Sequence, residues 1–185
     1  MRVPLLILVY RCGDVGKLTR IAATASDPTF SSNYPRKNKD APFLVLGGFT
    51  DFLLSGAYAN GHGAITGLAN VAPVSKQMLY NTVTMISLLQ QHAVVTLFQL
   101  SERSKIDPTL LGEAQRLQGI VARADATIAK ASIAGTKFLL NKLYGYGGNP
   151  RRPLPPIEPA AGEALWEHAH TRALVDVEIS LARTG

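Results

Sequence analysis

Apolar and polar positions are arranged in blocks that predict short strands followed by helices. Val3–Tyr10 and residues 43–47 are continuous apolar runs, the pattern of parallel strands buried on both faces. A third short run covers residues 62–67, and Asp51–Tyr58 between the last two runs has helical spacing. A strand, a helix and a strand within about thirty residues form a βαβ unit, which requires a parallel sheet. The pattern therefore predicts an α/β fold with three parallel strands.

Helical periodicity dominates the rest of the chain. Asp14 predicts the N-cap of a helix over Val15–Ala25. Asp107 and Pro108 predict the N-cap and first residue of a long helix. Its apolar stripe, at spacings of three and four, comprises Leu110, Ala114, Leu117, Val121, Ala124, Ile128 and Ala131. Such a stripe indicates a packing face.

Glycine, proline and polar clusters predict where these elements end. We expect the long helix to break at Gly135 and a further helix to cover Thr136–Tyr144. A single helix is predicted over Pro159–Arg183, because Leu165, Ala169, Ala173, Val177 and Leu181 repeat every four residues. Ser26–Asp40 is rich in proline, serine and asparagine and predicts an exposed loop.

Composition excludes several classes of function. The chain of 185 residues has 46% hydrophobic and 17% charged residues, which is typical of one globular unit. Its net charge of +6 hints at anionic ligands, but the basic residues are scattered, and the run Arg36–Lys39 is typical of a solvated loop. No basic stripe is interleaved with aromatic residues, so nucleic-acid binding is not expected.

The cysteine and the apolar segments bear on compartment. A single cysteine, Cys12, excludes an intramolecular disulfide framework and favours a reducing compartment such as the cytoplasm. No apolar run of about 18 residues exists, so no membrane span is expected. Residues 1–10 imitate a signal peptide, yet no convincing small-residue cleavage site follows. A buried strand is the favoured interpretation.

No motif for a metal or a nucleotide cofactor is present. Gly61–Gly67 reads GHGAITG, in which the third glycine comes one position too late for a dinucleotide fingerprint. His62, His92, His168 and His170 form no ligand constellation. Arg151 and Arg152 could clamp a carboxylate, but a structural role for their loop is favoured. We therefore expect neither cofactor nor metal.

Three segments resemble one enzyme family. The segment GGFTDFLLSGAYANGHGAITGLANVAP (residues 47–73) resembles the seventh and eighth strands of the dihydrodipicolinate synthase/N-acetylneuraminate lyase family. Residues 12–25, CGDVGKLTRIAATA, resemble its sixth strand–helix junction, and GGNPRRPLPP its C-terminal signature. The likeness is greatest to the fungal 4-hydroxy-2-oxoglutarate aldolase branch. It implies a (β/α)8 barrel that condenses or cleaves pyruvate and an aldehyde through a lysine Schiff base.

The resemblance also shows that the catalytic lysine is replaced. The family has this lysine three residues before the cysteine, where the chain has Val9. A Schiff base needs an amine that can be deprotonated in a dry pocket, which valine lacks. Arg11 stays protonated, and Lys17 is predicted to point to solvent from the following helix. No catalytic residue is therefore assigned within the chain.

The resemblance assigns two substrate-binding positions. Gly48 matches the glycine near the pyruvate carboxylate, and Ile65 matches the residue whose carbonyl approaches the Schiff base. An alternative accounts for the same residues equally well, namely that the glycines only permit tight turns. Cys12 matches a position without a nucleophilic role, and we expect it to be a small packed residue.

Length limits how much of this barrel is present. A complete barrel takes about 250 residues, so we expect only the last three βα units, in residues 1–106, followed by an α-helical C-terminal region, 107–185. Residues 77–92 have no counterpart in the family. Two interpretations compete: a helical insertion, or translated intron sequence in a faulty gene prediction, which is favoured.

Two hypotheses for function follow. The first is a Schiff-base aldolase or lyase acting on pyruvate-containing substrates, whose remaining parts lie outside this chain. The second is an inactive fragment that at most associates with full-length relatives. A homo-oligomer is an expected form in either case, and a mitochondrial location is the alternative for a full-length parent.

Overall fold

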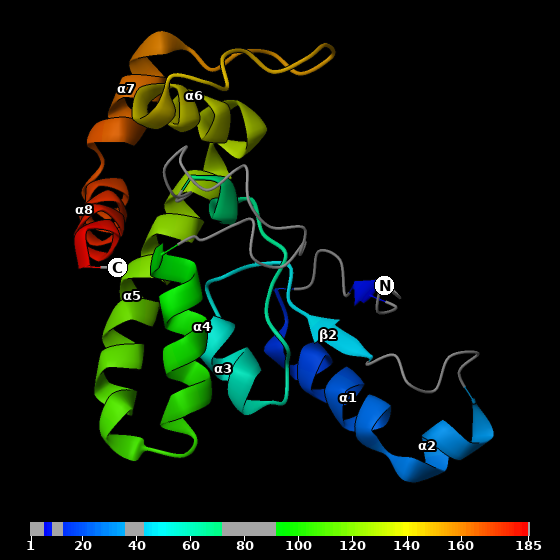
Figure 1. Ribbon diagram of the computed structural model, residues 1–185. Helices are drawn as coiled ribbons and strands as arrows, with labels where there is room; N and C mark the ends of the chain where they lie inside the picture. The colour runs from blue at the N-terminus through cyan, green and yellow to red at the C-terminus, as the bar shows by residue number, and fades with distance from the viewer. Residues whose placement is uncertain (1–5, 9–12, 36–42, 72–91, 185) are drawn as a thin grey trace, which may run out of the picture.

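The computed structural model describes residues 6–8, 13–35, 43–71 and 92–184 (Figure 1). Helices and a small sheet follow one another along the chain. In order they are β1 (Leu6–Leu8), α1 (Val15–Ser26), α2 (Pro28–Asn33), β2 (Leu44–Leu46), α3 (Leu53–Tyr58), η1 (Leu68–Asn70), α4 (His92–Ser104), η3 (Pro108–Leu110), α5 (Leu111–Lys130), α6 (Ser132–Tyr144), α7 (Pro159–Glu167) and α8 (Ala169–Thr184).

The sheet confirms the parallel arrangement predicted from the apolar runs. β1 pairs in parallel with β2, with Leu6 opposite Leu44 and Leu8 opposite Leu46. Residues 62–67 do not form the predicted third strand. They contribute only one parallel bridge, between Ala64 and Gly47. Gly63 has φ +135°, a conformation that favours glycine and interrupts a regular strand. Within the described residues the fold is mostly helical and no closed barrel is present.

One helix lies where the sequence predicts a loop. α2 occupies part of Ser26–Asp40 because Asp27 caps it, accepting a hydrogen bond from the Thr29 N–H at 2.7 Å, while Pro28 takes the first turn. The same Asp-Pro signal at Asp107 is confirmed, although a 3₁₀ turn precedes α5 there. The run Arg36–Lys39 lies outside the described residues.

Two helix breaks differ from prediction. α5 ends at Lys130, and Ser132, the first residue of α6, has φ +53°, whereas Gly135 lies buried inside α6. A Cβ at Gly135 would overlap Ala131 and Leu165, so this glycine allows close packing and does not end the helix.

The predicted helix over Pro159–Arg183 is two helices. His168, with ψ 131°, separates α7 from α8. Within α8, Ala169 and Ala173 of the predicted stripe are exposed, while Thr171, Leu174, Val175 and Glu178 are buried. The buried positions follow the three-and-four spacing of a helix face instead of a strict repeat of four, and Val177 and Leu181 pack at the edge of that face.

The larger core is built around α5. α4 and α5 run side by side, α8 packs against both, and α6 and α7 lie beyond one end of α5 (Figure 1). The stripe predicted for α5 is confirmed, because Ala114, Leu117, Val121, Ala124 and Ile128 are all buried. A smaller cluster lies between α1 and β2, around Leu18, Ala22, Val45 and Phe52.

Candidate functional site

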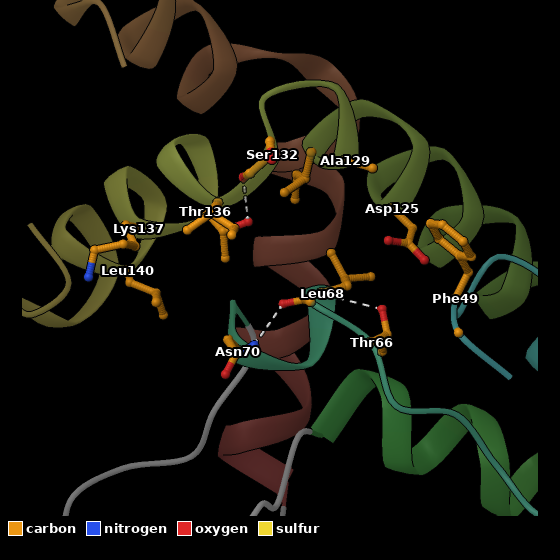
Figure 2. Close-up of a pocket in the computed structure, with 14 residues that line it drawn as sticks. Phe49, Thr66, Leu68, Asn70, Asp125, Ala129, Ser132, Thr136, Lys137 and Leu140 are labelled. Atoms are coloured by element: carbon orange, nitrogen blue, oxygen red, sulfur yellow. Dashed lines mark hydrogen bonds between the residues drawn. The ribbon is translucent and has the colours of Figure 1, made fainter. Parts of the chain in front are cut away.

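A cavity of about 490 Å³ lies beyond the end of β2, between the β2–α3 turn, η1 and the elbow where α5 meets α6 (Figure 2). Ligand pockets of small molecules have volumes of this order. The floor and walls are mixed, with Leu68, Ile128 and Leu140 as apolar members and Thr66 and Asn70 as polar ones. Gly48 and Phe49 in the wall follow the carboxyl end of β2. Ligands of open α/β folds bind at this end of the strands.

A buried carboxylate fixes the turn at one end of the cavity. Asp125 of α5 is 5% exposed and accepts two hydrogen bonds on Oδ2 from Thr50, one from the backbone N–H at 2.8 Å and one from Oγ1 at 2.6 Å. Thr50 itself is fully buried and follows Gly48 by two residues. Because hydrogen bonds to a charged acceptor are strong, α5 holds the shape of the glycine turn.

Gln118 adds a second attachment on the same face of α5, about two turns before Asp125. Its side-chain oxygen accepts the Leu54 N–H at 2.7 Å, and its amide nitrogen donates to the Thr50 carbonyl at 2.9 Å. Together, Gln118 and Asp125 satisfy three backbone groups at the start of α3, where an unpaired buried group would be costly. α5 thus substitutes for the missing N-cap side chain of α3.

The same carboxylate perturbs its neighbour Asp51. Burial raises the pKa of the Asp51 carboxyl, and the negative charge of Asp125 raises it further. Asp51 does not line the cavity. Asp125 is therefore the carboxylate that lines this end of the cavity.

Lys137 supplies the opposite charge. It is half-buried on α6 and lines the cavity at the side away from Asp125 (Figure 2). Thr136 beside it donates its hydroxyl to the Ser132 carbonyl at 3.0 Å, and Asn70 on the opposite wall donates to the Gly67 carbonyl at 3.1 Å. Lys137 and Asp125 therefore lie at opposite ends of the lining, and the ammonium nitrogen of Lys137 is directed away from the other lining side chains (Figure 2).

The structure brings one predicted substrate-binding residue to the cavity wall. Gly48 lines the cavity, as does Thr66. Ile65 does not line it; its side chain is 45% exposed and its N–H donates to the Gly47 carbonyl at 2.9 Å. The turn of Gly47–Gly48 and residues 63–65 are thus adjacent, as neighbouring parallel strands require.

Other predicted positions contribute less or cannot be placed. Lys17 is exposed on α1, as expected. Val9, Tyr10, Arg11 and Cys12 lie outside the described residues, as does the segment 77–91. The absence of the Schiff-base lysine therefore remains a prediction from sequence.

Sequence reasoning missed Asp125, Gln118 and Lys137. Asp125 directly follows Ala124 in the apolar stripe of α5, and an acidic side chain at the edge of a buried stripe is a signal that it has a partner. Which partner it has depends on the fold, since Thr50 lies 75 residues earlier.

The described residues contain no group of three or more metal-ligating side chains. The rings of His168 and His170 contact each other edge to face, and His170 Nδ1 lies 3.0 Å from the Thr127 hydroxyl. In the same part of the chain, no helix is long and apolar enough to cross a membrane.

Parallel strands that end beside a cavity are an arrangement found in α/β folds. No protein-family model matches the chain. L-threo-3-deoxy-hexylosonate aldolase of Hypocrea jecorina is 33% identical over 85% of this chain, and that of Aspergillus niger is 30% identical over 93%. A probable 4-hydroxy-2-oxoglutarate aldolase, mitochondrial, of Emericella nidulans is 33% identical over 83%.

A solved structure agrees in fold. The chain superposes on a dihydrodipicolinate synthase family protein from Coccidioides immitis with a TM-score of 0.57 and 23% identity, over 97% of this chain and 47% of that one. The chain is thus similar in sequence to fungal aldolases and in fold to a dihydrodipicolinate synthase family protein. It spans 37% to 47% of the length of these three curated relatives, which fits their C-terminal part.

Proposed function

We propose that the chain forms part of a Schiff-base aldolase that makes or cleaves pyruvate-containing keto acids, and that it supplies the substrate-binding strand ends without the reacting lysine. The observation that carries the proposal is the parallel Gly47–Ala64 bridge, which holds the segment around Ala64 beside the end of β2, next to the cavity. In such folds, substrates bind where strands end.

The proposal assigns each part of the chain a role. β1, β2 and residues 62–67 correspond to the last three strands of a (β/α)8 barrel, in residues 1–106, and residues 107–185 form a helical region that supports the glycine turn. Gly48 binds the keto-acid carboxylate, and the carbonyl of Ile65 faces the reacting carbon. Val9 replaces the lysine, so the chain alone forms no Schiff base. The cytoplasm is the proposed compartment.

Covalent trapping in a chimera tests this assignment. The part of the Hypocrea jecorina aldolase that this chain does not cover is joined to residues 1–185, with Val9 either kept or replaced by lysine (Val9→Lys). Each protein is incubated with pyruvate and sodium borohydride and analysed by mass spectrometry. We expect a stoichiometric pyruvyl adduct on residue 9 in the Val9→Lys chimera only, because only an amine there can form the imine.

The controls make a negative result informative. The intact Hypocrea jecorina enzyme verifies the trapping conditions, and circular dichroism verifies that both chimeras are folded. A folded Val9→Lys chimera without adduct contradicts the proposed alignment of the strands. A stoichiometric adduct in the Val9 chimera at another lysine contradicts the proposed loss of the nucleophile.

The second candidate is an inactive fragment that associates with full-length relatives or with itself. The observation in its favour is that Ile65 is 45% exposed next to the short Gly47–Ala64 bridge, so apolar surface remains uncovered there. Light scattering after size-exclusion chromatography distinguishes this candidate, since it requires an oligomer or a mixed complex.

A further inference from the structure

One hydrogen bond beside the cavity is accepted by a histidine ring. The Val45 N–H in β2 donates to Nδ1 of His62 at 3.1 Å, and the His62 N–H donates to the Val45 carbonyl at 2.8 Å. In a regular parallel ladder, an N–H in this position donates to a backbone carbonyl of the neighbouring strand. The side chain of His62 takes the place of that carbonyl.

The backbone shows why a side chain is needed there. Gly63 has φ +135°, so residues 62–65 do not follow a regular strand. They are held to Gly47 by two further hydrogen bonds of 2.9 Å, through the Gly63 carbonyl and the Ile65 N–H. Val45 is 1% exposed, and a buried N–H without an acceptor is costly. The histidine ring therefore completes the pairing of this segment with β2.

This hydrogen bond fixes the protonation of the ring. An N–H can donate to Nδ1 only when that nitrogen carries no proton, so the ring of His62 is neutral with its proton on Nε2. In the imidazolium form both ring nitrogens are donors, and an Nδ1–H would face the Val45 N–H. A backbone carbonyl remains an acceptor when the pH changes, whereas a histidine changes its charge between about pH 5 and 8.

The charged groups around the ring belong to neighbouring elements. Gly61, directly before the histidine, approaches Leu18 of α1, and its N–H donates to the Gly56 carbonyl of α3 at 2.7 Å. β2 carries no titratable side chain, and those on α1 with its N-cap, on the β2–α3 turn and on α3 are Asp14, Lys17, Arg20, Asp51 and Tyr58. Asp14 pairs with Arg20 at 3.9 Å, and the Tyr58 hydroxyl lies 3.1 Å from that of Ser104. Because these groups comprise two cations and two carboxylates, we attribute a response to pH to the hydrogen bond of the ring.

We propose that His62 is a pH-sensitive switch at the edge of the cavity. The neutral ring holds residues 62–65 against β2, and the protonated ring releases the Val45 N–H and loosens that segment. Gly48 and Thr66 line the cavity directly after the two segments that the switch joins, so it acts on two adjacent parts of the cavity wall. The inference does not depend on the proposed aldolase function.

Amide hydrogen exchange followed by NMR tests the switch on the isotope-labelled chain of 185 residues. The protection factor of Val45, corrected for the intrinsic effect of pH on exchange, is measured at about pH 5.5 and about pH 7.5. We expect it to be at least ~5-fold lower at the lower pH, the factor that loss of one typical hydrogen bond gives. The protection of Leu117 in α5 serves as the internal reference and should not change.

Three variants separate the charge of the ring from its role as an acceptor. His62→Asn keeps an acceptor near the position of Nδ1 but cannot be protonated, so the protection of Val45 should be the same at both pH values. His62→Ala has no acceptor, so the protection should be low at both. His168→Ala is the matched control, because Nδ1 of His168 also accepts a backbone N–H, that of His170 at 3.2 Å, but at the break between α7 and α8. It should leave the pH response of Val45 unchanged.

Several results would overturn the inference. One is a protection of Val45 that does not depend on pH in the unsubstituted chain, and another is an equal pH response in folded His62→Asn. The tautomer gives a check that needs no variant, since long-range NMR correlations of the ring should place the proton of His62 on Nε2 at about pH 7.5. A proton on Nδ1 at that pH would contradict the proposal directly. None of these results affects the adduct expected in the Val9→Lys chimera.

Discussion

The two parts of the molecule differ in how they are stabilised. The helices α4–α8 enclose a large apolar cluster in which Leu97, Leu139 and Leu174 are fully buried. The unit of α1 and β2 has a cluster of four buried residues, and large side chains such as Phe30 and Tyr34 next to it are exposed. Burial of apolar surface is the main stabilising contribution in folding, so the helical region is the more stable part.

The smaller unit depends on the larger one through both polar and apolar contacts. Leu53, Leu68 and Val71 extend from the strand-end segments into the helical cluster. Asp125 and Gln118 of α5 hold Thr50 and Leu54. The comparison shows that the segment bearing the candidate site is shaped by a helix far away in sequence, more than by its own small core.

The largest expected effect comes from the centre of the helical core. Leu117→Ala removes a side chain that is 1% exposed on α5, and such a cavity costs about 2–5 kcal/mol of unfolding free energy. Because α5 also supports the site, we expect the whole chain to lose stability in one transition. Urea denaturation followed by circular dichroism measures the change.

Two further variants sharpen that comparison. Ile106→Ala truncates a side chain that is 89% exposed and should change stability by less than ~0.5 kcal/mol. Leu18→Ala empties the small cluster and should increase amide hydrogen exchange in α1 and β2 more than in α5. Equal exchange changes in both regions would show that they unfold as one unit.

The next largest effect on stability is expected from Asp125, the carboxylate that links α5 to the glycine turn. Asp125→Ala leaves the Thr50 N–H and hydroxyl without their acceptor, which costs about 1–3 kcal/mol. We expect faster hydrogen exchange in residues 47–58 and a smaller change in α8. Asp125→Asn should cost less, because its amide oxygen can still accept one hydrogen bond.

Asp176→Ala is the control for this link, as Asp176 is an exposed aspartate on α8. It should leave exchange in residues 47–58 unchanged. If Asp125→Ala and Asp176→Ala had the same small effect, α5 would not determine the shape of the glycine turn.

The smallest effect concerns pH. Burial and the charge of Asp125 raise the pKa of Asp51 above its ordinary value of 3.8. The folded state then binds this proton more tightly than the unfolded state, so the stability it contributes is present below about pH 3.8 and is lost as pH rises through the raised pKa. Asp51→Asn should therefore stabilise the chain near pH 7, by about 0.5 kcal/mol since solvent screens the pair.

Thermal unfolding of the two proteins between pH 4 and 7 measures this difference. The gain from Asp51→Asn should shrink toward pH 4. In an Asp125→Asn background the gain should also shrink, because the repelling charge is gone. If the stability gained by Asp51→Asn did not change with pH, ionisation of the Asp51 carboxyl would not be its cause.

Local signals made much of the fold predictable from sequence. Caps at Asp14 and Asp107 and the stripe of α5 depend on neighbours in sequence, and the structure confirms them. The break at Ser132 and the break at His168 were missed because they reflect tertiary packing that overrides periodicity. Gly48 could be assigned through family resemblance, whereas Asp125 and Lys137 enter the cavity wall only once α5 and α6 are placed.

The hydrogen bonds from Thr50 to Asp125 also bear on the order of folding. The two residues are 75 positions apart, and contacts of long sequence separation form late because a long loop must close first. During synthesis, the glycine turn leaves the ribosome well before α5 does. The Thr50 N–H and hydroxyl therefore have no Asp125 acceptor until α5 has been translated. The candidate site can form only after α5, which follows it in the chain, has folded.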